Sequence, residues 1–237
     1  MNTLDTAVII AGGNGLRLGS DTLDKPKAMV RLLERPIIDW IIFWLKKNGV
    51  RTIIIGVDYK KEVLMEHLGD GRALGVKVLY NDHHGASETG DAFRSALERH
   101  DLPETFLALN GDQITDLRVK EMWAAHQRYN PIATIATCPV RIPYGIPSIN
   151  DDSTIEMFRE KPVLHDTFMS TGIYIFNKDI LAHLPQQGSL EKETFTKLAQ
   201  LKKLRAYKHR GFFTTINDQK ELVLAQELLR DLNPKLL

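Results

Sequence analysis

The sequence predicts an α/β fold in which helices cover both faces of a mostly parallel sheet. Short apolar runs, each closed by glycine or polar residues, alternate with amphipathic stretches along the chain. No internal repeat, low-complexity segment or linker interrupts the 237 residues, which predicts a single domain over residues 1–237. A chain of this length can bury a sizeable core, and its one cysteine, Cys138, excludes a disulfide framework within the chain.

The first half, up to about residue 138, consists of alternating strand and helix patterns. Strands are expected where apolar and β-branched residues cluster before a turn, at residues 7–10, 52–57, 76–80, 106–109 and 132–137. Helices are expected where apolar residues recur every three or four positions, at residues 37–45, 62–68, 90–97 and 117–129. Successive units of this kind place their strands parallel in one sheet.

The second half, about residues 139–237, has a different pattern. Strands are expected at residues 144–149, 155–158 and 171–176, separated by turns rather than long helices. Helices are expected at residues 189–198 and 219–229. We therefore expect a smaller mixed-sheet subregion that lies against the first half.

The charge balance excludes several classes of partner. The chain has 31 Lys plus Arg against 30 Asp plus Glu, a formal net charge of +1. This balance argues against a general nucleic-acid binder and against a polybasic membrane module. No apolar run reaches about 18 residues, and the first ten residues lack the basic start of a signal peptide. We expect a cytoplasmic protein with no nucleic-acid or membrane partner.

A glycine-rich loop follows the first expected strand. Removing side chains there lets the backbone approach a ligand closely, and the exposed N–H groups can surround phosphate oxygens. Arg17 and Lys27 add a planar and a mobile cation nearby. A tight structural turn with incidental basic residues is the alternative interpretation. The loop residues are Ala11, Gly12, Gly13, Asn14 and Gly15.

Two common phosphate-binding motifs do not fit this loop. The P-loop requires Gly-Lys-Ser/Thr at its end, which is missing here. The dinucleotide-binding fingerprint requires a third glycine where this chain has Leu18.

An ordered set of motifs resembles the sugar-1-phosphate nucleotidyltransferase family. The loop, with Arg17 and Leu18, and then Lys25-Pro26-Lys27, matches the family pattern G-G-x-G-x-R-L followed by K-P-K. Four later elements match in the family's order, and together the five cover residues 11 to about 176. They are Leu109-Asn110-Gly111-Asp112, Tyr144-Gly145-Ile146, Phe158-Arg159-Glu160-Lys161-Pro162 and Thr171-Gly172-Ile173-Tyr174-Ile175-Phe176.

The resemblance implies a Rossmann-like three-layer domain that joins a nucleoside triphosphate to a sugar 1-phosphate and releases pyrophosphate. Residues 1–138 would form the nucleotide-binding half and residues 139–237 the sugar-phosphate half. Arg17 would hold the β- and γ-phosphates, Lys27 would reach the α-phosphate, and the backbone of residues 11–15 would bind the nucleotide. Asp112 would ligate the Mg²⁺ cofactor.

The resemblance also assigns a sugar-phosphate wall. Glu160 would accept hydrogen bonds from sugar hydroxyls, and Lys161 would meet the sugar phosphate. Gly145 and Gly172 would allow the backbone to approach the sugar ring. On its own, an adjacent Glu-Lys pair usually marks a solvated turn.

The base pocket is expected around residues 88–92, where related enzymes carry G-T-(A/G)-G-A. Thr89 is the matching base contact, whereas Glu88 departs from the usual glycine. A carboxylate such as Glu88 or Asp82 can accept from guanine N1–H and N2–H₂, or from the cytosine amino group. This chemistry favours GTP, with an exposed loop carboxylate as the alternative interpretation.

One family element differs. The late W-x-D-(I/V)-G-T-P segment usually offers a second metal carboxylate, and the aligned residue here is Thr215. Asn217 or Asp218 can supply an oxygen from nearby. The alternative is that the second ligand has been lost.

We therefore carry three hypotheses from the sequence. The first is Mg²⁺-dependent transfer of a nucleoside monophosphate, from GTP to a mannose- or heptose-like 1-phosphate. The second is a cytidylyl-, thymidylyl- or uridylyltransferase that acts on another sugar phosphate or a phospho-alcohol. The third is a non-catalytic regulatory subunit that binds nucleotide sugars. In each case the partners are small molecules. Core packing explains the tryptophan-rich helix at residues 37–45, and a dimer surface there, compatible with a homo-oligomer, is the alternative.

Overall fold

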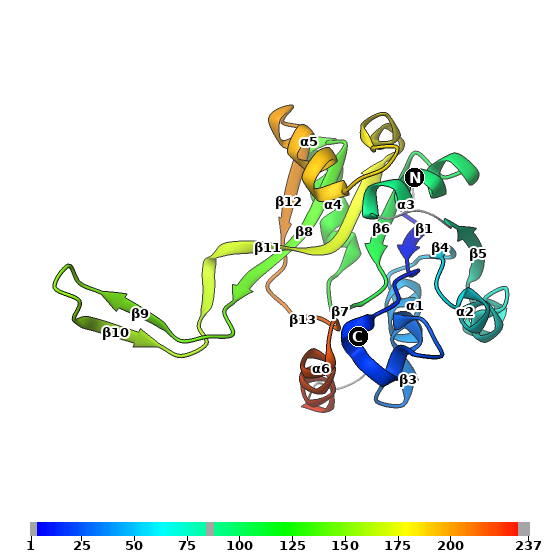
Figure 1. The fold of residues 1–237 in the computed structure, drawn as a ribbon. Coiled ribbons are helices and arrows are strands. Elements are labelled where there is room, and N and C mark those ends of the chain that lie inside the picture. Colours follow the sequence, from blue (N-terminus) through cyan, green and yellow to red (C-terminus); the bar gives the residue numbers. More distant parts are fainter. Residues whose placement is uncertain (1–3, 84–87, 232–237) are drawn as a thin grey trace.

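A seven-stranded sheet forms the centre of the computed structural model, which describes residues 4–83 and 88–231 (Figure 1). Its order is β12-β8-β11-β6-β1-β4-β5. Neighbouring strands are parallel except for β11, which runs antiparallel to both β6 and β8. The predicted α/β fold with a mostly parallel sheet is therefore confirmed. The strands are β1 Thr6–Ile10, β4 Thr52–Val57, β5 Lys77–Asp82, β6 Thr105–Asn110, β8 Ala133–Arg141, β11 Val163–Asn177 and β12 Leu204–Lys208.

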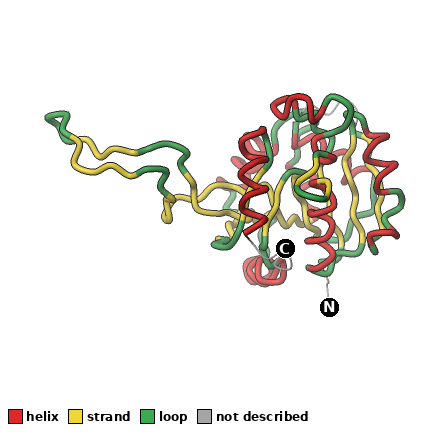
Figure 2. The backbone as a smooth tube through the Cα atoms, turned by 90° about the horizontal axis from the view of Figure 1, so that it is seen from below, coloured by secondary structure: helices red, strands yellow, loops and turns green. Residues whose placement is uncertain are grey.

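Successive side chains of each strand point to opposite faces of the sheet, so the core forms two layers. Ala7 and Ile9 of β1 belong to one apolar cluster, and Val8 between them belongs to the other. This follows from the two-residue period of a strand. Figure 2 shows helices on both sides of the strands. The first cluster includes residues of α1 Ile37–Lys47, α2 Lys61–Leu68, α4 Val119–Tyr129 and α6 Gln219–Asp231, and the second includes residues of α3 Thr89–Arg99 and α5 Thr196–Gln200.

One predicted helix begins with a π-helical turn in the structure. Where a continuous helix was expected at residues 189–198, Leu190–Phe195 form a π-helical turn that continues into α5. Ser189 caps this turn, since its hydroxyl accepts a hydrogen bond from the backbone N–H of Lys192. Thr194 within the turn is fully buried and donates its hydroxyl hydrogen bond to the carbonyl of His183.

Three small antiparallel pairs lie outside the main sheet. The pair nearest the site joins β7 to β13, and its register sets Gln113 opposite Thr215. The pair of β2 and β3 forms a tight hairpin before α1, and the pair of β9 and β10 forms a long hairpin. The strands are β2 Arg31–Leu32 with β3 Arg35–Pro36, β7 Gln113–Thr115 with β13 Phe213–Thr215, and β9 Ile146–Ile149 with β10 Ile155–Arg159.

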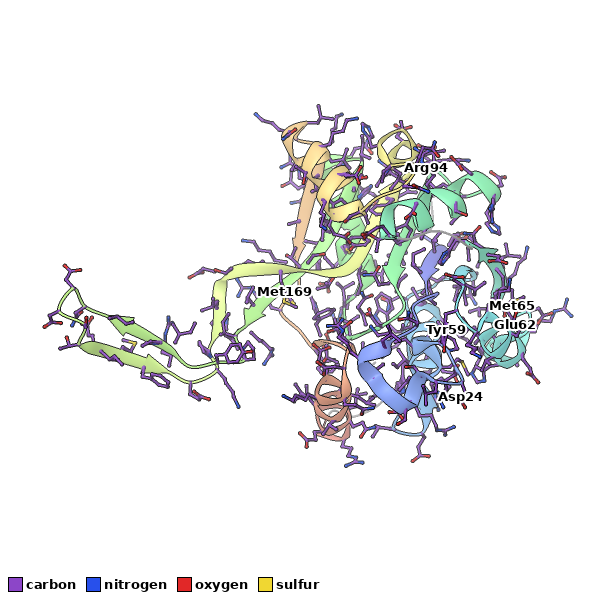
Figure 3. The ribbon with its side chains drawn as sticks, viewed as in Figure 1. Asp24, Tyr59, Glu62, Met65, Arg94 and Met169 are labelled. Atoms are coloured by element: carbon purple, nitrogen blue, oxygen red, sulfur yellow. The ribbon has the colours of Figure 1, made fainter. Side chains whose placement is uncertain are left out.

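The long hairpin departs from the sequence-based expectation. Instead of lying against the first half, β9 and β10 project from the body as an arm, defined here as residues 142–162 (Figures 1 and 2). The strands that lead into it, β8 and β11, belong to the central sheet and extend beyond it. Figure 3 marks Met169 on β11 near the base of the arm. Tyr144 and Phe158 on the arm expose 74% and 61% of their surface, so both rings lie mostly in solvent.

The second apolar cluster gives a stability prediction. Phe93 of α3 is fully buried and meets Tyr174 and Phe176 edge to face. Phe93→Ala should lower the free energy of unfolding by about 3–5 kcal/mol because it leaves a cavity among aromatic rings. Urea denaturation measures this loss. Phe43→Ala is the matched control on α1, where the ring is 42% exposed, and its cost should stay below about 1 kcal/mol. Equal losses for the two variants would contradict this description of the core.

Candidate functional site

The glycine loop lies at the carboxyl ends of the parallel strands. Ala11 donates its backbone N–H to the carbonyl of Gly56 at the end of β4, which fixes the start of the loop. Lys27 donates its backbone N–H to the carbonyl of Gly13, which folds the following segment back onto the loop. Gly15 has a φ of 63°, a conformation that favours glycine. Gly13 is exposed and a Cβ there would touch nothing, so this stretch of backbone is accessible.

The Lys27 ammonium joins three distant parts of the chain. Its Nζ lies 2.5 Å from Asp112 Oδ2, just after β6, and 2.8 Å from Asn217 Oδ1, just after β13. The side chains of Lys27 and Asp112 are only 14% and 19% exposed, so their charges are partly desolvated. The second carboxylate oxygen, Asp112 Oδ1, is buried and has no hydrogen-bond partner in the described chain.

A small network orients the Asn217 amide. Its Nδ2 donates to Thr215 Oγ1 at 3.0 Å and to Glu221 Oε2 at 3.1 Å, so Oδ1 is left facing Lys27. The Asn217 backbone N–H also donates to Glu221 Oε2. Thr215 therefore holds the Asn217 side chain rather than pointing an oxygen at Lys27. The turn itself is fixed by Ile216, whose N–H donates to the Asp112 carbonyl.

Asp218, the other candidate oxygen from this segment, has a structural role. Its Oδ1 accepts a hydrogen bond from the backbone N–H of Glu221, and its carbonyl accepts from Leu222. Both contacts satisfy free N–H groups at the start of α6. The geometry therefore separates Asn217, which meets Lys27, from Asp218, which caps a helix.

A cavity of about 240 Å³ adjoins these residues. Thr89, at the first turn of α3, forms part of its wall, and its hydroxyl donates to Glu191 Oε2 at 2.8 Å. Behind it Tyr174 is buried, and desolvation together with the charge of Glu191 raises the pKa of the tyrosine hydroxyl. The cavity is lined by Ile10, Ala11, Gly13, Lys27, Ala28, Thr89, Asn110, Gly111 and Asp112.

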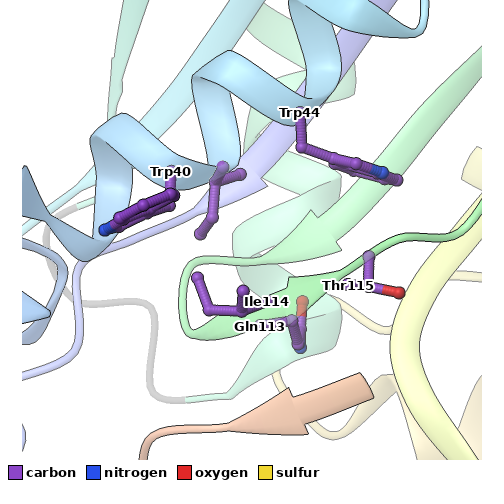
Figure 4. A pocket seen from close by; sticks show the side chains of 6 residues that line it. Trp40, Trp44, Gln113, Ile114 and Thr115 are labelled. Carbon is purple, nitrogen blue, oxygen red and sulfur yellow. The ribbon is translucent and has the colours of Figure 1, made fainter. Parts of the chain in front are cut away.

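The helix α1 supports the strand that follows Asp112. Trp40 and Trp44 lie beside Ile114 of β7 and leave a space of only about 10 Å³, too small for a substrate (Figure 4). Their indole N–H groups donate to the carbonyls of Leu32 and Leu117. The two tryptophans are therefore core residues that fix β7.

The other residues expected to contact the nucleotide lie on the exposed loop or outside the cavity. Arg17 and Asn14 are exposed on the loop, and no side chain in residues 4–83 or 88–231 pairs with the Arg17 guanidinium. Glu88 caps α3 through a reciprocal pair of hydrogen bonds with Asp91. Asp82 forms an ion pair with Lys61 at 2.5 Å. The two carboxylates considered for base recognition thus already have partners elsewhere.

The expected sugar-phosphate residues fall into two groups. Gly145, Glu160 and Lys161 lie on the arm, where a Cβ on Gly145 would meet Phe158 and Glu160 Oε2. Within the described residues, no hydrogen bond or ion pair connects Glu160 or Lys161 to Lys27 or Asp112. Gly172, in contrast, lies beside Asn110 because Ile173 of β11 pairs with Leu109 of β6.

The structure reveals site residues that the motifs did not identify. Glu221 orients Asn217. Its position four residues after Asn217, in the first turn of α6, is the sequence feature that could have indicated this contact. Gln113 follows Asp112 directly, but the sequence does not indicate that it is buried. The buried side-chain oxygen of Asn110, two residues before Asp112, could not be deduced from the motif either. His83 is buried against Gly12 through a contact between separate strand ends.

The sequence profile of the nucleotidyl transferase family matches residues 6–217, so the chain belongs to this family. The particular relatives are sugar-phosphate enzymes. Mannose-1-phosphate guanylyltransferase catalytic subunit beta of Drosophila pseudoobscura pseudoobscura is 32% identical over 225 residues, which cover 92% of this chain and 60% of the relative. The UTP–glucose-1-phosphate uridylyltransferase of Synechocystis sp. is 29% identical and is matched over 81% of this chain and 54% of its own length.

Solved structures agree with the fold. HddC from Yersinia pseudotuberculosis, complexed with GMP-PN, superimposes with a TM-score of 0.72 at 25% identity, covering 94% of this chain and 99% of the other. The resemblance to the sugar-1-phosphate nucleotidyltransferases is therefore confirmed. Across the described part of the chain, no helix combines the length and apolar character needed to cross a bilayer.

The packing of the loop yields a second stability prediction. A Cβ on Gly12 would lie 2.7 Å from the His83 ring and 2.9 Å from Asp58 Cβ, so Gly12→Ala forces the loop or the ring to move. We expect a loss of about 1–3 kcal/mol in the free energy of unfolding. Gly13→Ala is the control, because its Cβ meets nothing within 4 Å. Guanidinium denaturation of both variants measures the difference, and equal stability would show that the His83 contact is unimportant.

Proposed function

We propose that the protein catalyses Mg²⁺-dependent transfer of GMP from GTP to a mannose- or heptose-like sugar 1-phosphate. The observation that carries this proposal is the meeting of Lys27, Asp112 and Asn217 beside the glycine loop and a substrate-sized cavity. The chain spans 60% of the length of the Drosophila relative, so the substrates are inferred from this chain's own site together with the comparison.

The reaction needs positioning and charge neutralisation more than a base. A phosphate oxygen of the sugar 1-phosphate, already anionic, attacks the α-phosphorus of GTP. The new P–O bond forms as the bond from the α-phosphorus to the bridging oxygen breaks, and pyrophosphate leaves with that electron pair. Lys27 would move from Asp112 to the α-phosphate, and Arg17, exposed on the loop, would hold the β- and γ-phosphates. Residues 11–15 would offer backbone N–H groups to the phosphates.

The residues around Lys27 fit a hard cation. Asp112 offers a buried carboxylate oxygen with no partner in the described chain, and Asn217 offers an amide oxygen that is already oriented. Mg²⁺ is commonly held by one or two carboxylates and completes its shell with water and substrate phosphates. When bound, the ion neutralises charge on the phosphate oxygens. Asp112 and Asn217 would hold it, with Thr215 and Glu221 as the residues that orient Asn217.

The base and sugar assignments rest on the comparisons and on the arm. The Drosophila relative is a guanylyltransferase and HddC was solved with GMP-PN, which favours guanine, and Thr89 lines the cavity. Gly145, Glu160 and Lys161 would contact the sugar phosphate only if the arm approaches the carboxyl ends of the sheet strands in the complex. Gly172 already lies there.

Pyrophosphate release tests the proposal. GTP, CTP, UTP, dTTP and ATP are each combined with mannose 1-phosphate, glucose 1-phosphate, a heptose 1-phosphate and phosphocholine, with and without Mg²⁺. We expect Mg²⁺-dependent release with GTP and the mannose or heptose substrate. Release with UTP or dTTP only would overturn the base assignment. Nucleotide binding without release for any pair would favour the regulatory subunit, for which Thr215 is the supporting observation.

The role of Lys27 can be isolated from nearby charge. Lys27→Ala should lower kcat by about two to three orders of magnitude, because the cation that meets the α-phosphate is removed. Lys25→Ala is the matched control: it removes a lysine two residues away whose ammonium, within the described residues, pairs with Asp24 at 3.5 Å. Steady-state pyrophosphate release and circular dichroism are measured for both. Near-normal turnover of a folded Lys27→Ala protein would contradict the assignment.

Asn217 and Asp218 are the two candidate metal ligands after β13, and two variants distinguish them. Asn217→Ala should raise the Mg²⁺ concentration needed for half-maximal turnover about tenfold, because one ligand oxygen is lost. Asp218→Ala removes the α6 cap instead, so it should lower Tm with little change in that concentration. A Mg²⁺ titration of turnover, combined with thermal unfolding, measures both effects. The opposite pattern would identify Asp218 as the ligand.

A further inference from the structure

The arm lacks a core of its own. Its strands β9 and β10 form a two-stranded sheet by themselves, and every residue of β10 is exposed. A hairpin of two strands is at best marginally stable in water unless a third strand or a helix packs against it. Ile149, Ile155 and Met157 near the tip are each more than half exposed, and apolar side chains gathered in this way mark interaction surfaces. We therefore expect a further surface to cover the arm.

The same part of the arm is acidic. Residues 149–157 contain three carboxylates and neither lysine nor arginine. Asp151, Asp152 and Glu156 are all exposed, and within the described residues no ion pair joins them to a cation. The Asp152 carboxylate accepts hydrogen bonds from the Thr154 N–H and hydroxyl in the turn, so Asp151 and Glu156 are the charges that a partner can meet. A surface that fits the tip is therefore both apolar and basic.

The chain itself supplies such a surface at one edge of the central sheet. β12 is the last strand in the sheet order, so its outer edge pairs with no other strand of the described chain. Residues 202–210, here called the basic edge, contain five cations and no carboxylate, and among the described residues none of the five forms an ion pair. Two of them lie over aromatic rings, Arg205 over Tyr129 at 4.9 Å and Lys208 over Phe168 at 4.8 Å. The five exposed cations are Lys202, Lys203, Arg205, Lys208 and Arg210.

The position of the arm favours contact with a second molecule. Figures 1 and 2 show the arm projecting away from the body, and Figure 1 shows β12 on the side from which it projects. The tip therefore lies away from the basic edge of its own chain. Two copies related by a twofold axis can each place an arm on the other's basic edge, because such an interface uses the same two surfaces twice.

We propose that a second copy of this chain covers the arm, in a twofold dimer in which each arm tip lies on the partner's basic edge. Asp151 and Glu156 face the cations of that edge, which gives the interface its charge complementarity. The apolar tip residues pack on the two aromatic rings and on the aliphatic stems of the lysines. A nucleic acid or another polyanion would also meet the cations, but it would leave the apolar tip in solvent. A second copy satisfies both surfaces at once.

The inference goes beyond the proposed function and does not depend on it. β12 runs in the same direction as β6, so its last residues lie at the carboxyl edge of the sheet, as Asp112 does. An arm docked on β12 therefore reaches the carboxyl edge of the partner's sheet. This position is compatible with the approach that Glu160 and Lys161 need in order to contact a sugar phosphate.

Charge reversal on the two surfaces tests the pairing. The arm variant Asp151→Lys/Glu156→Lys should raise the dimer dissociation constant about a hundredfold or more, because like charges then oppose each other. The edge variant Lys203→Glu/Lys208→Glu should do the same. An equimolar mixture of the two variants should form dimers again, since the basic arm fits the acidic edge and the native arm fits the native edge. Sedimentation equilibrium of the full chain measures the constants, and circular dichroism checks the fold of each variant.

A matched control and salt complete the experiment. Glu62→Lys/Glu66→Lys reverses two exposed carboxylates on α2, which lies across the body from the arm, and should leave the dissociation constant unchanged (Figure 3). Added salt should weaken the wild-type dimer, because contacts between exposed charges are screened.

Three results would overturn the proposal. The first is a wild-type protein that stays monomeric at every concentration, including one that binds heparin through Lys203 and Lys208, which would assign the basic edge to a polyanion. The second is a dimer that both variants leave intact, because its interface would lie elsewhere. The third is loss of the dimer in both folded variants without recovery in the mixture, because the two surfaces would then not meet each other. None of these measurements uses substrate, so each outcome is independent of the proposed reaction.

Discussion

The contact of the Lys27 ammonium with Asp112 and Asn217 is the constraint on which the arrangement of the site depends. Lys27 arrives from the glycine loop after β1, Asp112 from the end of β6, and Asn217 from the turn between β13 and α6. The pairing of β7 with β13 and the hydrogen bond from the Ile216 N–H to the Asp112 carbonyl also join the late segment to the end of β6. The two charges are partly desolvated, so each stabilises the other only while the pair is intact. A bound nucleotide would give Lys27 a phosphate in place of Asp112, and its metal ion would give Asp112 a cation in place of Lys27. For this reason we propose that the reaction takes place here.

Thr215 changes how this family member completes its site. The Thr215 hydroxyl donates to Glu221 and accepts from the Asn217 amide, whose oxygen faces Lys27. The amide contributes no charge, so among the described residues Asp112 is the one carboxylate in ion-pair contact with the Lys27 ammonium. This lower negative charge would weaken metal binding by the protein alone and make it depend more on the phosphates of the substrate.

Local patterns predicted the strands, most helices and the residues close to the first strand. Ala7–Ile10 and residues 106–109 are short apolar runs before glycine or Asn-Gly-Asp, and such runs become buried parallel strands with little tertiary influence. Asp112 and Lys27 stand in contiguous motifs, so the sequence alone singles them out, and the structure brings their side chains into contact. The direction of the arm could not be predicted, because it depends on how far β8 and β11 continue past the sheet. The orientation of Asn217 depends on Glu221 and Thr215 together.

The central claim is that Lys27 exchanges Asp112 for a phosphate when substrate binds. A crystal structure with a non-hydrolysable GTP analogue and Mg²⁺ tests it most directly, through the distance from Lys27 Nζ to Asp112 Oδ2, which is 2.5 Å in the free protein. The account predicts that this pair separates, with Lys27 on the α-phosphate and the metal ion on Asp112 and Asn217. A nucleotide bound with the Lys27–Asp112 pair still closed, or with its phosphates away from residues 11–15, would contradict it.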